Sequence, residues 1–257
     1  MVILGRFGEI AEVKVDIAQG IGSVGVFGCA PAIFFERGSC SVEVTGKGSL
    51  EFLERMTTGN VRKKPGSITY CLLLNERAGI LSDITVMRRG EQDFFVGVNS
   101  NIDINYLRLL APDNVHVRDI TGGTVGLGLF GPKSRELAQS LTRDDLSNEA
   151  LPYFRLKNIY LGHVPAMLCR LSYVGELGYE IYTTADLALK LWDTLWRAGK
   201  KYGLIAAGRG AFNSMRLEKG YRSYGVDMNS EHNPYEAGWP LRSVRVEDIR
   251  APRLSMK

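Results

Sequence analysis

The sequence has few of the residues on which metal and disulfide chemistry depend. Its 257 residues include four cysteines and three histidines. No two cysteines form a C-x-x-C pair, and His116, His163 and His232 are far apart along the chain. These spacings argue against the common zinc sites and against a dense disulfide framework. We therefore expect no metal site, and we expect the cysteines to be buried thiols in a reducing compartment.

Long apolar runs are also absent. No stretch approaches the ~20 residues that a membrane-spanning helix needs. The first residues, MVILGRFGEI, contain the early acid Glu9 and resemble neither a secretory signal nor a mitochondrial presequence. The net charge is +4, from 32 basic and 28 acidic side chains, without a basic stripe. We therefore expect neither a membrane nor a nucleic acid as a partner.

The usual nucleotide and hydrolase motifs are missing as well. The sequence contains no G-x-S-x-G elbow and no P-loop. Residues 20–25 match G-x-G-x-x-G as a string, but Pro31 stands where the required helix should run. The sequence thus argues against a dinucleotide site, and residues 1–40 show no stable period.

From residue 41 onward the periodicity predicts regular elements. Strands are expected at 41–44, 68–74, 79–88, 94–98, around His116, at 125–130, in a hairpin over 154–171, and at 179–183. Helices are expected around Leu50–Met56, at 101–110, after Gly131-Pro132, from a Thr184 cap to Gly199, and at 209–219. Runs of strands broken by helices favour an α+β fold. The polar loop 142–152 is the expected division between two sub-domains.

Two polar residues stand out against the apolar strands. Asp83 lies within the apolar stretch 80–86, so it is either on the wet face of a sheet or held in a site, where burial would raise its pKa. Asn99 follows the strand at 94–98 and is either a cap for the next helix or part of the same site. The spacing alone favours the wet face for Asp83, and it leaves both roles open for Asn99.

The segment 172–180 is the second candidate. Gly175 and Gly178 bracket Glu176, which indicates a tight connection between strands. Tyr173 and Tyr179 offer flat faces for an aromatic ligand, and Glu180 lies four residues beyond Glu176. An exposed hairpin explains the pattern equally well.

These motifs, taken in order, resemble the folate-binding aminomethyltransferase family of the glycine-cleavage T-protein. Within that family the chain looks most similar to the folate domain of sarcosine and dimethylglycine dehydrogenases. The resemblance covers about three quarters of the sequence. The residues that carry it are 79–86, 145–150, 171–182, 213–222 and 233–238.

The resemblance implies a tetrahydrofolate site. Asp83 matches the acidic residue beside the reacting nitrogens, and Asn99 and Tyr173 match residues that line the site. Glu180 matches the carboxylate that holds the pterin edge, because a carboxylate accepts paired N–H bonds from a pterin ring. Glu176 would then play a structural role. Lys219-Gly220-Tyr221 lacks the cysteine of the iron–sulfur-assembly branch of the family.

The resemblance also sets the expected domain organisation. We expect residues 41–238 to form the folate-binding domain, preceded by a poorly matched segment at 1–40 and followed by an unmatched basic tail at 239–257. The C-terminal β-barrel of the family has no counterpart in this sequence, and neither does the FAD domain of the amine dehydrogenases. We therefore expect the chain to hold no FAD and to be unable to oxidise an amine on its own.

The function implied by the resemblance is one-carbon transfer. The chain would accept a methylene unit from oxidised methylamines of the sarcosine or dimethylglycine type and form methylenetetrahydrofolate. An FAD-dependent amine dehydrogenase is the implied partner, and the mitochondrial matrix is the implied compartment, with the cytoplasm as the second candidate. Two different interpretations stay open: a non-catalytic protein similar to the pyruvate dehydrogenase phosphatase regulatory subunit, and a fragment of a full-length dehydrogenase.

Overall fold

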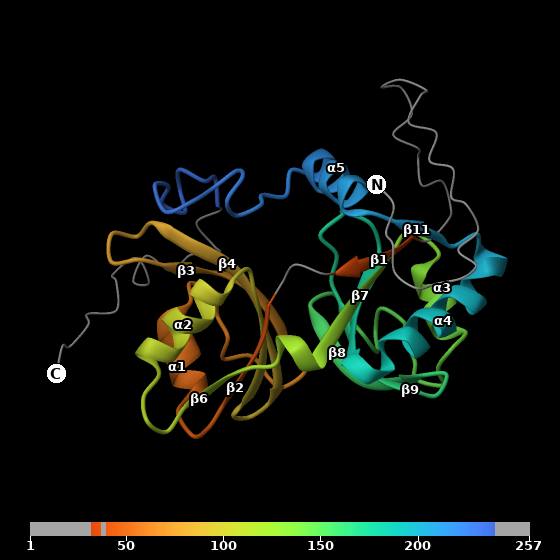
Figure 1. The fold of residues 1–257 in the computed structure, drawn as a ribbon, viewed down its shortest axis with the longest axis horizontal. Helices are drawn as coiled ribbons and strands as arrows, with labels where there is room; N and C mark the ends of the chain where they lie inside the picture. Colours follow the sequence, from red (N-terminus) through yellow and green to blue (C-terminus); the bar gives the residue numbers. More distant parts are fainter. Residues whose placement is uncertain (1–31, 37–39, 240–257) are drawn as a thin grey trace.

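The computed structural model describes residues 32–36 and 40–239, which form two β-sheets with helices on their outer faces (Figure 1). The strands are β1 Ala32–Glu36, β2 Cys40–Thr45, β3 Ile68–Leu74, β4 Ile80–Gly90, β5 Asp93–Val98, β6 His116–Asp119, β7 Thr124–Phe130, β8 Arg155–Leu161, β9 Val164–Arg170, β10 Gly178–Thr184 and β11 Ile205–Ala207. The α-helices are α1 Ser49–Met56, α2 Asn101–Leu110, α3 Ser134–Gln139, α4 Ala188–Gly199 and α5 Arg209–Lys219. Short 3-10 turns lie at Thr121–Gly123, Ala185–Leu187 and Lys200–Tyr202. The predicted α+β fold class is confirmed.

The five-stranded sheet has the order β3-β4-β5-β2-β6, and neighbouring strands are antiparallel. Helices α1 and α2 cover one of its faces. Leu53 and Leu107 from these helices are fully buried against Ile84 and Val86 of β4. Burying each such side chain is worth about 1.5–3 kcal/mol, so this face is the core of the first half of the molecule.

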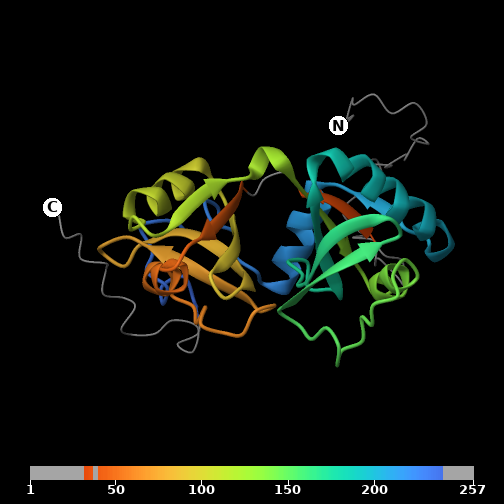
Figure 2. The same ribbon diagram turned by 90° about the horizontal axis from the view of Figure 1, so that it is seen from below.

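The six-stranded sheet has the order β11-β1-β7-β10-β9-β8. Helices α3 and α4 lie against one face of it, with Leu137, Leu191 and Leu195 buried beside Leu129 and Ile181 of the sheet. This apolar cluster is the core of the second half, which lies beside the first half in Figure 2.

The two halves meet through the remaining faces of their sheets. Met87 and Phe95 of the five-stranded sheet share a buried cluster with Met167 and Tyr182 of the six-stranded sheet. Backbone bonds also cross the junction, from Ile68 N–H to the Phe154 carbonyl (2.9 Å) and from Leu156 N–H to the Gly66 carbonyl (2.9 Å). Side chains on the junction-facing side of β4 and β10 therefore lie near the boundary between the halves.

Helix α5 lies at the top of the molecule in Figure 1, and the segment after it continues above β3 and β4. Residues 221–239 are held to β4 by a bond from Ile80 N–H to the His232 carbonyl (3.0 Å). Met228 and Ala237 pack on Leu72 and Ile80. This segment, called the crossing segment below, brings the last described residues to the strand that carries Asp83.

Most of the predicted elements are confirmed, including α5 at its expected bounds. Strands β1 and β11 were not expected. The predicted Thr184 cap is wrong for the long helix, because Ala185–Leu187 form a 3-10 turn and α4 starts at Ala188. The chain passes between the sheets at 120–123, and loop 142–152 lies between α3 and β8 within the second half.

Several other expectations concern residues outside the described part. The glycine string at 20–25, nearly all of segment 1–40 and the tail from 240 to 257 lie outside it, and so does Cys29. Within it, Cys71 and Cys169 are buried as predicted, and Cys40 is half-buried. None of the helices in the described ranges is long and apolar enough to cross a lipid bilayer.

Candidate functional site

Asp83 lies in the middle of β4 on the face opposite α1 and α2. Its neighbours Ser82 and Ile84 point to the helix-covered face, because successive side chains of a strand alternate. Asp83 is partly buried and accepts one hydrogen bond on each carboxylate oxygen. The Tyr70 hydroxyl donates to Oδ2 at 2.5 Å, and the Asn99 side-chain amide donates to Oδ1 at 2.7 Å. The carboxylate is thus held at two points.

Asn99 belongs to this arrangement and not to the helix cap. Ser100 is the N-cap residue of α2. The Asn99 side chain is exposed, and its Nδ2 also lies 3.0 Å from Ser82 Oγ and 3.0 Å from the Asp83 carbonyl. Of the two roles that the spacing allowed, the structure therefore favours proximity to Asp83.

Tyr70 was not singled out by the sequence. It lies on β3 diagonally across the ladder from Asp83, since Leu72 pairs with Asp83 and Tyr70 pairs with Thr85. Burial and the adjacent negative charge of Asp83 raise the pKa of the Tyr70 hydroxyl, so it stays protonated and donates its hydrogen. The only signal in the sequence is the strand periodicity, which reveals this pair once the register is known.

Tyr173 lies in the connection between β9 and β10. Its ring stacks with Phe212 of α5 (5.2 Å between centroids) and with Tyr221 (5.9 Å). Its hydroxyl donates to the carbonyl of Arg222. Burial raises the pKa of Tyr173, and the negative charge of Asp83 adds to that effect, which places this aromatic stack within electrostatic range of the carboxylate.

Glu180 lies on β10 and is only 6% exposed. It accepts a hydrogen bond from the Tyr182 hydroxyl at 2.7 Å. Burial raises the pKa of Glu180 to about 7, and the Tyr182 bond opposes this effect. A carboxylate has about four lone-pair sites, so Glu180 keeps acceptor capacity for further N–H groups beside the Tyr182 bond.

Tyr153 is a further tyrosine whose pKa is affected both by Tyr221 of the aromatic stack and by Glu180. Burial and the neighbouring Tyr221 raise the pKa of Tyr153 to about 12, and the charge of Glu180 contributes to the same shift. Tyr221 in turn stacks on Tyr173. The structure therefore brings Asp83 and Asn99 into direct contact. The charge of Asp83 acts on Tyr173, and the charge of Glu180 acts on Tyr153.

Glu176 is exposed and lies outside this arrangement. Its neighbour Gly175 has a φ of +80°, and a side chain there would collide with Lys219 of α5. Glycine at this position therefore lets the 172–178 connection, which contains Tyr173, lie close to α5.

Arg216 braces the beginning of the crossing segment. Its side chain is 2% exposed and donates to Asn213 Oδ1 (2.9 Å), to the Tyr221 carbonyl (3.0 Å) and to the carboxylate of Asp227. A buried, hydrogen-bonded guanidinium of this kind fixes backbone positions. Here it fixes the backbone of Tyr221, which forms one side of the stack.

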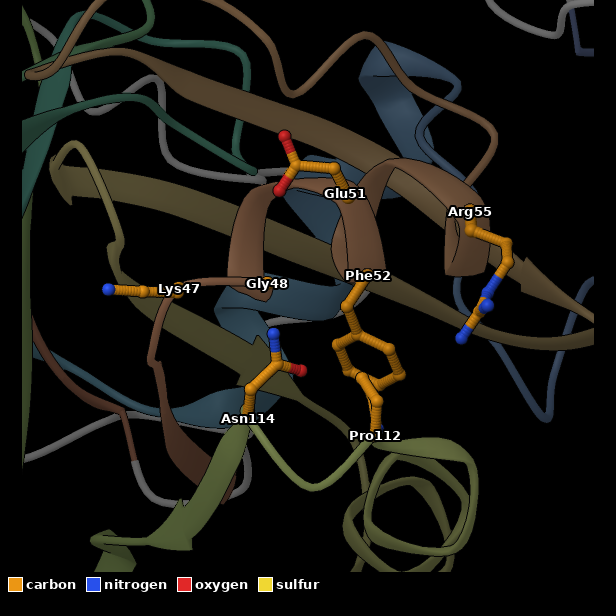
Figure 3. Close-up of a pocket in the computed structure, with 7 residues that line it drawn as sticks. All are labelled: Lys47, Gly48, Glu51, Phe52, Arg55, Pro112 and Asn114. Carbon is orange, nitrogen blue, oxygen red and sulfur yellow. The ribbon is translucent and has the colours of Figure 1, made fainter.

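A surface hollow of about 360 Å³ lies elsewhere, between α1 and the loop at 112–114 (Figure 3). Phe52 and Pro112 form its apolar part, and charged or polar groups surround them. None of Asp83, Asn99, Tyr173 and Glu180 lines it. The lining residues are Lys47, Gly48, Glu51, Phe52, Arg55, Pro112 and Asn114. The candidate site and this hollow are therefore separate features.

Comparison with known proteins gives three concordant results. Residues 37–242 match the family model described as GCVT N-terminal domain. The chain is 38% identical over 200 residues to 4-methylaminobutanoate oxidase (formaldehyde-forming) of Paenarthrobacter nicotinovorans, covering 76% of this chain and 24% of the relative. It is 30% identical over 201 residues to mitochondrial dimethylglycine dehydrogenase of Homo sapiens, covering 76% of this chain and 23% of the relative.

Among solved structures, the fold is similar to that of glycine cleavage system aminomethyltransferase T from Bartonella henselae. The TM-score is 0.71 at 26% identity, and the match covers 80% of this chain and 55% of that chain. The chain therefore spans about a quarter of the two curated relatives and just over half of the solved structure.

Proposed function

This chain belongs to the GCVT N-terminal domain family, and from that premise we propose that it binds tetrahydrofolate and carries out one-carbon transfer. The observation that carries the proposal is the Asp83 carboxylate, which accepts a hydrogen bond on each oxygen, from Tyr70 and from Asn99. A reduced folate supplies two nitrogens, one in its reduced ring and one in the attached side chain, that together accept a one-carbon unit at the oxidation level of formaldehyde. The transfer therefore needs no net oxidation.

The donor set of the site fits such a ligand. A flat pterin ring presents several N–H donors on one edge, and Glu180 is a buried carboxylate that can accept them. The stacked rings of Phe212, Tyr173 and Tyr221 offer aromatic faces beside it. The ligand residues in this proposal are thus Asn99, Tyr173 and Glu180.

Asp83 is the catalytic residue in this proposal. Loss of an amine and capture of its carbon require a proton to move, and a positioned carboxylate can hold that proton or balance the developing positive charge. Donors on both oxygens fix the plane of the carboxylate, and its partial exposure leaves one side open to a ligand. Tyr70 stays protonated and keeps its bond to Oδ2.

The donor class follows from the relatives. One is named an oxidase of 4-methylaminobutanoate and the other a dehydrogenase of dimethylglycine. We extend this to the chain as a methylene unit from an oxidised methylamine, delivered by an FAD-dependent amine dehydrogenase, to give methylenetetrahydrofolate. The human relative is named mitochondrial, and the mitochondrial matrix is the compartment that we propose.

Calorimetric titration of tetrahydrofolate into the purified chain tests the proposal. The wild-type chain should bind it. Asp83→Asn should keep most of the affinity but lose the catalysed conversion of formaldehyde and tetrahydrofolate, measured above the uncatalysed rate. Glu180→Gln should instead weaken binding by roughly tenfold, the value of one charge-assisted bond.

Glu176→Gln is the matched control, because it makes the same change at an exposed carboxylate on the adjoining connection. It should bind like the wild type. A wild-type chain that shows no binding would contradict the proposed function. Equal small effects of Asp83→Asn and Glu180→Gln would contradict the assigned roles.

A further inference from the structure

A second hydrogen-bonded layer lies behind Asp83, on the helix-covered face of β4. We propose that Ser82 and Asp103 are positioning residues, which hold the Asn99 amide in the one orientation that donates to Asp83. The inference rests on the proposed function, in which Asp83 is the group that acts on the one-carbon unit.

Asp103 accepts most of the hydrogen bonds in this layer. It lies in the first turn of α2 and is 4% exposed. Its Oδ2 accepts three hydrogen bonds, from Ser82 Oγ (2.9 Å), from Asn99 N–H (2.9 Å) and from Ser100 N–H (3.1 Å). The same carboxylate oxygen therefore ties the backbone of Asn99 to a side chain of β4.

The number of hydrogens on Ser82 sets the direction of the network. A serine hydroxyl has one hydrogen, and here the carboxylate of Asp103 is its acceptor at 2.9 Å. Ser82 Oγ can therefore only accept from Asn99, whose Nδ2 lies 3.0 Å away. This selects the amide orientation in which the other Nδ2 hydrogen points to Asp83 Oδ1 at 2.7 Å.

Asn99 needs such a device because its side chain is exposed at the junction of β5 and α2. An exposed side chain samples several rotamers, and fixing one of them costs entropy. With the amide turned over, its oxygen would face three acceptors: Ser82 Oγ, the Asp83 carbonyl and Asp83 Oδ1. The hydrogen bond to Ser82 Oγ restricts the Asn99 rotamer from the buried, helix-covered face of the sheet.

Asp103 also has a purely structural role, because an acid at this position caps the helix. That role explains the bonds to Asn99 N–H and Ser100 N–H. It does not require the hydroxyl of Ser82, which lies on a different element, 21 residues away in the sequence. Ser82→Ala therefore separates positioning from capping, because it leaves the cap intact.

Ser49→Ala is the matched control. Ser49 is also a serine at 0% exposure in the same half of the molecule, and its hydroxyl donates one side-chain bond, to Gln92 Oε1 at 3.0 Å. Both variants remove one buried hydroxyl and the side-chain hydrogen bond that it donates. Only Ser82→Ala removes a bond to the Asn99 amide.

The first readout needs no ligand. It is the exchange rate of the Asn99 side-chain amide hydrogens with solvent, measured by nuclear magnetic resonance and assigned by their loss in Asn99→Asp. Ser82→Ala should raise this rate by at least about tenfold, because the Asn99 amide loses its one buried acceptor and keeps only its exposed bonds to Asp83. Ser49→Ala should leave it unchanged, and Ser82→Thr, which keeps the hydroxyl, should restore the slow exchange.

The second readout is one-carbon transfer. Ser82→Ala should lower turnover by roughly tenfold and raise the Kd for tetrahydrofolate by a smaller factor of about twofold to threefold, since Asn99 is one of three proposed ligand residues and its displacement acts mainly on the placement of Asp83. Slow exchange in Ser82→Ala, or turnover equal to that of Ser49→Ala, would overturn the inference. A wild-type chain that does not bind tetrahydrofolate contradicts the proposed function instead, and the amide exchange still decides whether Ser82 positions Asn99.

Discussion

At the scale of single residues, the two carboxylates of the site differ in their surroundings. Asp83 is partly buried and has a donor on each oxygen. Glu180 is almost fully buried, with the Tyr182 hydroxyl bonded to it. Burial disfavours the charged form of a carboxyl group, so holding Glu180 ready for a ligand with N–H donors costs the unliganded protein stability. Such a cost in stability is expected at a position where ligand binding, and not folding, determines which amino acid is present.

This cost leads to a prediction about pH. The pKa of Glu180 is raised by burial from an ordinary value of 4.5 to about 7. Between these values the folded state binds more protons than the unfolded state, so stability falls as pH rises from about 4.5 to about 7. Glu180→Gln carries no charge and should escape that loss. From about pH 5 to about pH 8, the variant should gain roughly 2.5 kcal/mol relative to the wild type, measured by urea unfolding.

Tyr182→Phe provides the complementary variant. The Tyr182 hydroxyl bond lowers the pKa of Glu180, so its removal should extend the decline of stability to higher pH. A constant difference between the wild type and Glu180→Gln across the pH range would show that Glu180 is not buried as a protonated acid.

At the scale of elements, local periodicity accounts for what could be predicted. Helix α5 matches its expected range, because its apolar spacing is a property of neighbouring residues. Strands β1 and β11 could not be predicted in this way, because they pair with each other across a long sequence separation and β11 has only three residues. Such long-range pairing leaves no local pattern in the sequence.

The same division applies to the site. The resemblance supplied Asp83, Asn99, Tyr173 and Glu180 as candidates, and the structure brings Asp83 and Asn99 into direct contact. Tyr70 and Ser82 could not be predicted. Tyr70 reaches Asp83 through the register of β3 on β4, and Ser82 reaches Asn99 only after α2 is placed against the sheet.

The crossing segment gives a prediction at this scale. A methyl group on Gly79 would overlap the carbonyl oxygen of Ser230 and come within 2.8 Å of Asn75 Nδ2. Gly79→Ala should therefore push the segment off the start of β4 and destabilise the protein by about 1–3 kcal/mol, measured by urea unfolding. Limited proteolysis should then cut within residues 221–239 faster than in the wild type.

Gly210→Ala is its control. It makes the same substitution in α5, where nothing lies within 4 Å of the added carbon. Alanine favours helix over glycine, so this variant should gain about 0.5–1 kcal/mol. If Gly79→Ala instead unfolds at the same urea concentration as the wild type and is cut no faster, the segment does not pack on β4.

At the scale of the whole molecule, the candidate site depends on both halves. Asp83 and Asn99 belong to the half with the five-stranded sheet, and Glu180 belongs to the half with the six-stranded sheet. The shared cluster around Phe95 and Tyr182, whose ring centroids are 4.9 Å apart, holds the halves together. A site divided in this way keeps its geometry only if the two halves fold as one cooperative unit.

The tryptophans allow a test of this coupling. The chain has three, of which Trp192 and Trp196 lie on α4 in the second half, and Trp239 packs on Tyr70 of the first half. In a Trp239→Phe background, fluorescence therefore reports on the second half alone, while far-ultraviolet circular dichroism reports on both halves. The two signals should show one common urea midpoint, because the halves unfold together.

Phe95→Ala in that background then tests whether the junction carries the coupling. Phe95 is 3% exposed and lies in the first half, and the cavity left by its removal should cost about 3–5 kcal/mol. If the halves are coupled, the fluorescence midpoint of the second half falls together with the dichroism midpoint.

Leu109→Ala is the control. It removes an apolar side chain that is 80% exposed in the same half as Phe95, and it should move neither midpoint. A fluorescence midpoint that stays in place while the dichroism signal splits into two transitions would show that the halves unfold separately. Glu180 would then not be held in a fixed position relative to Asp83.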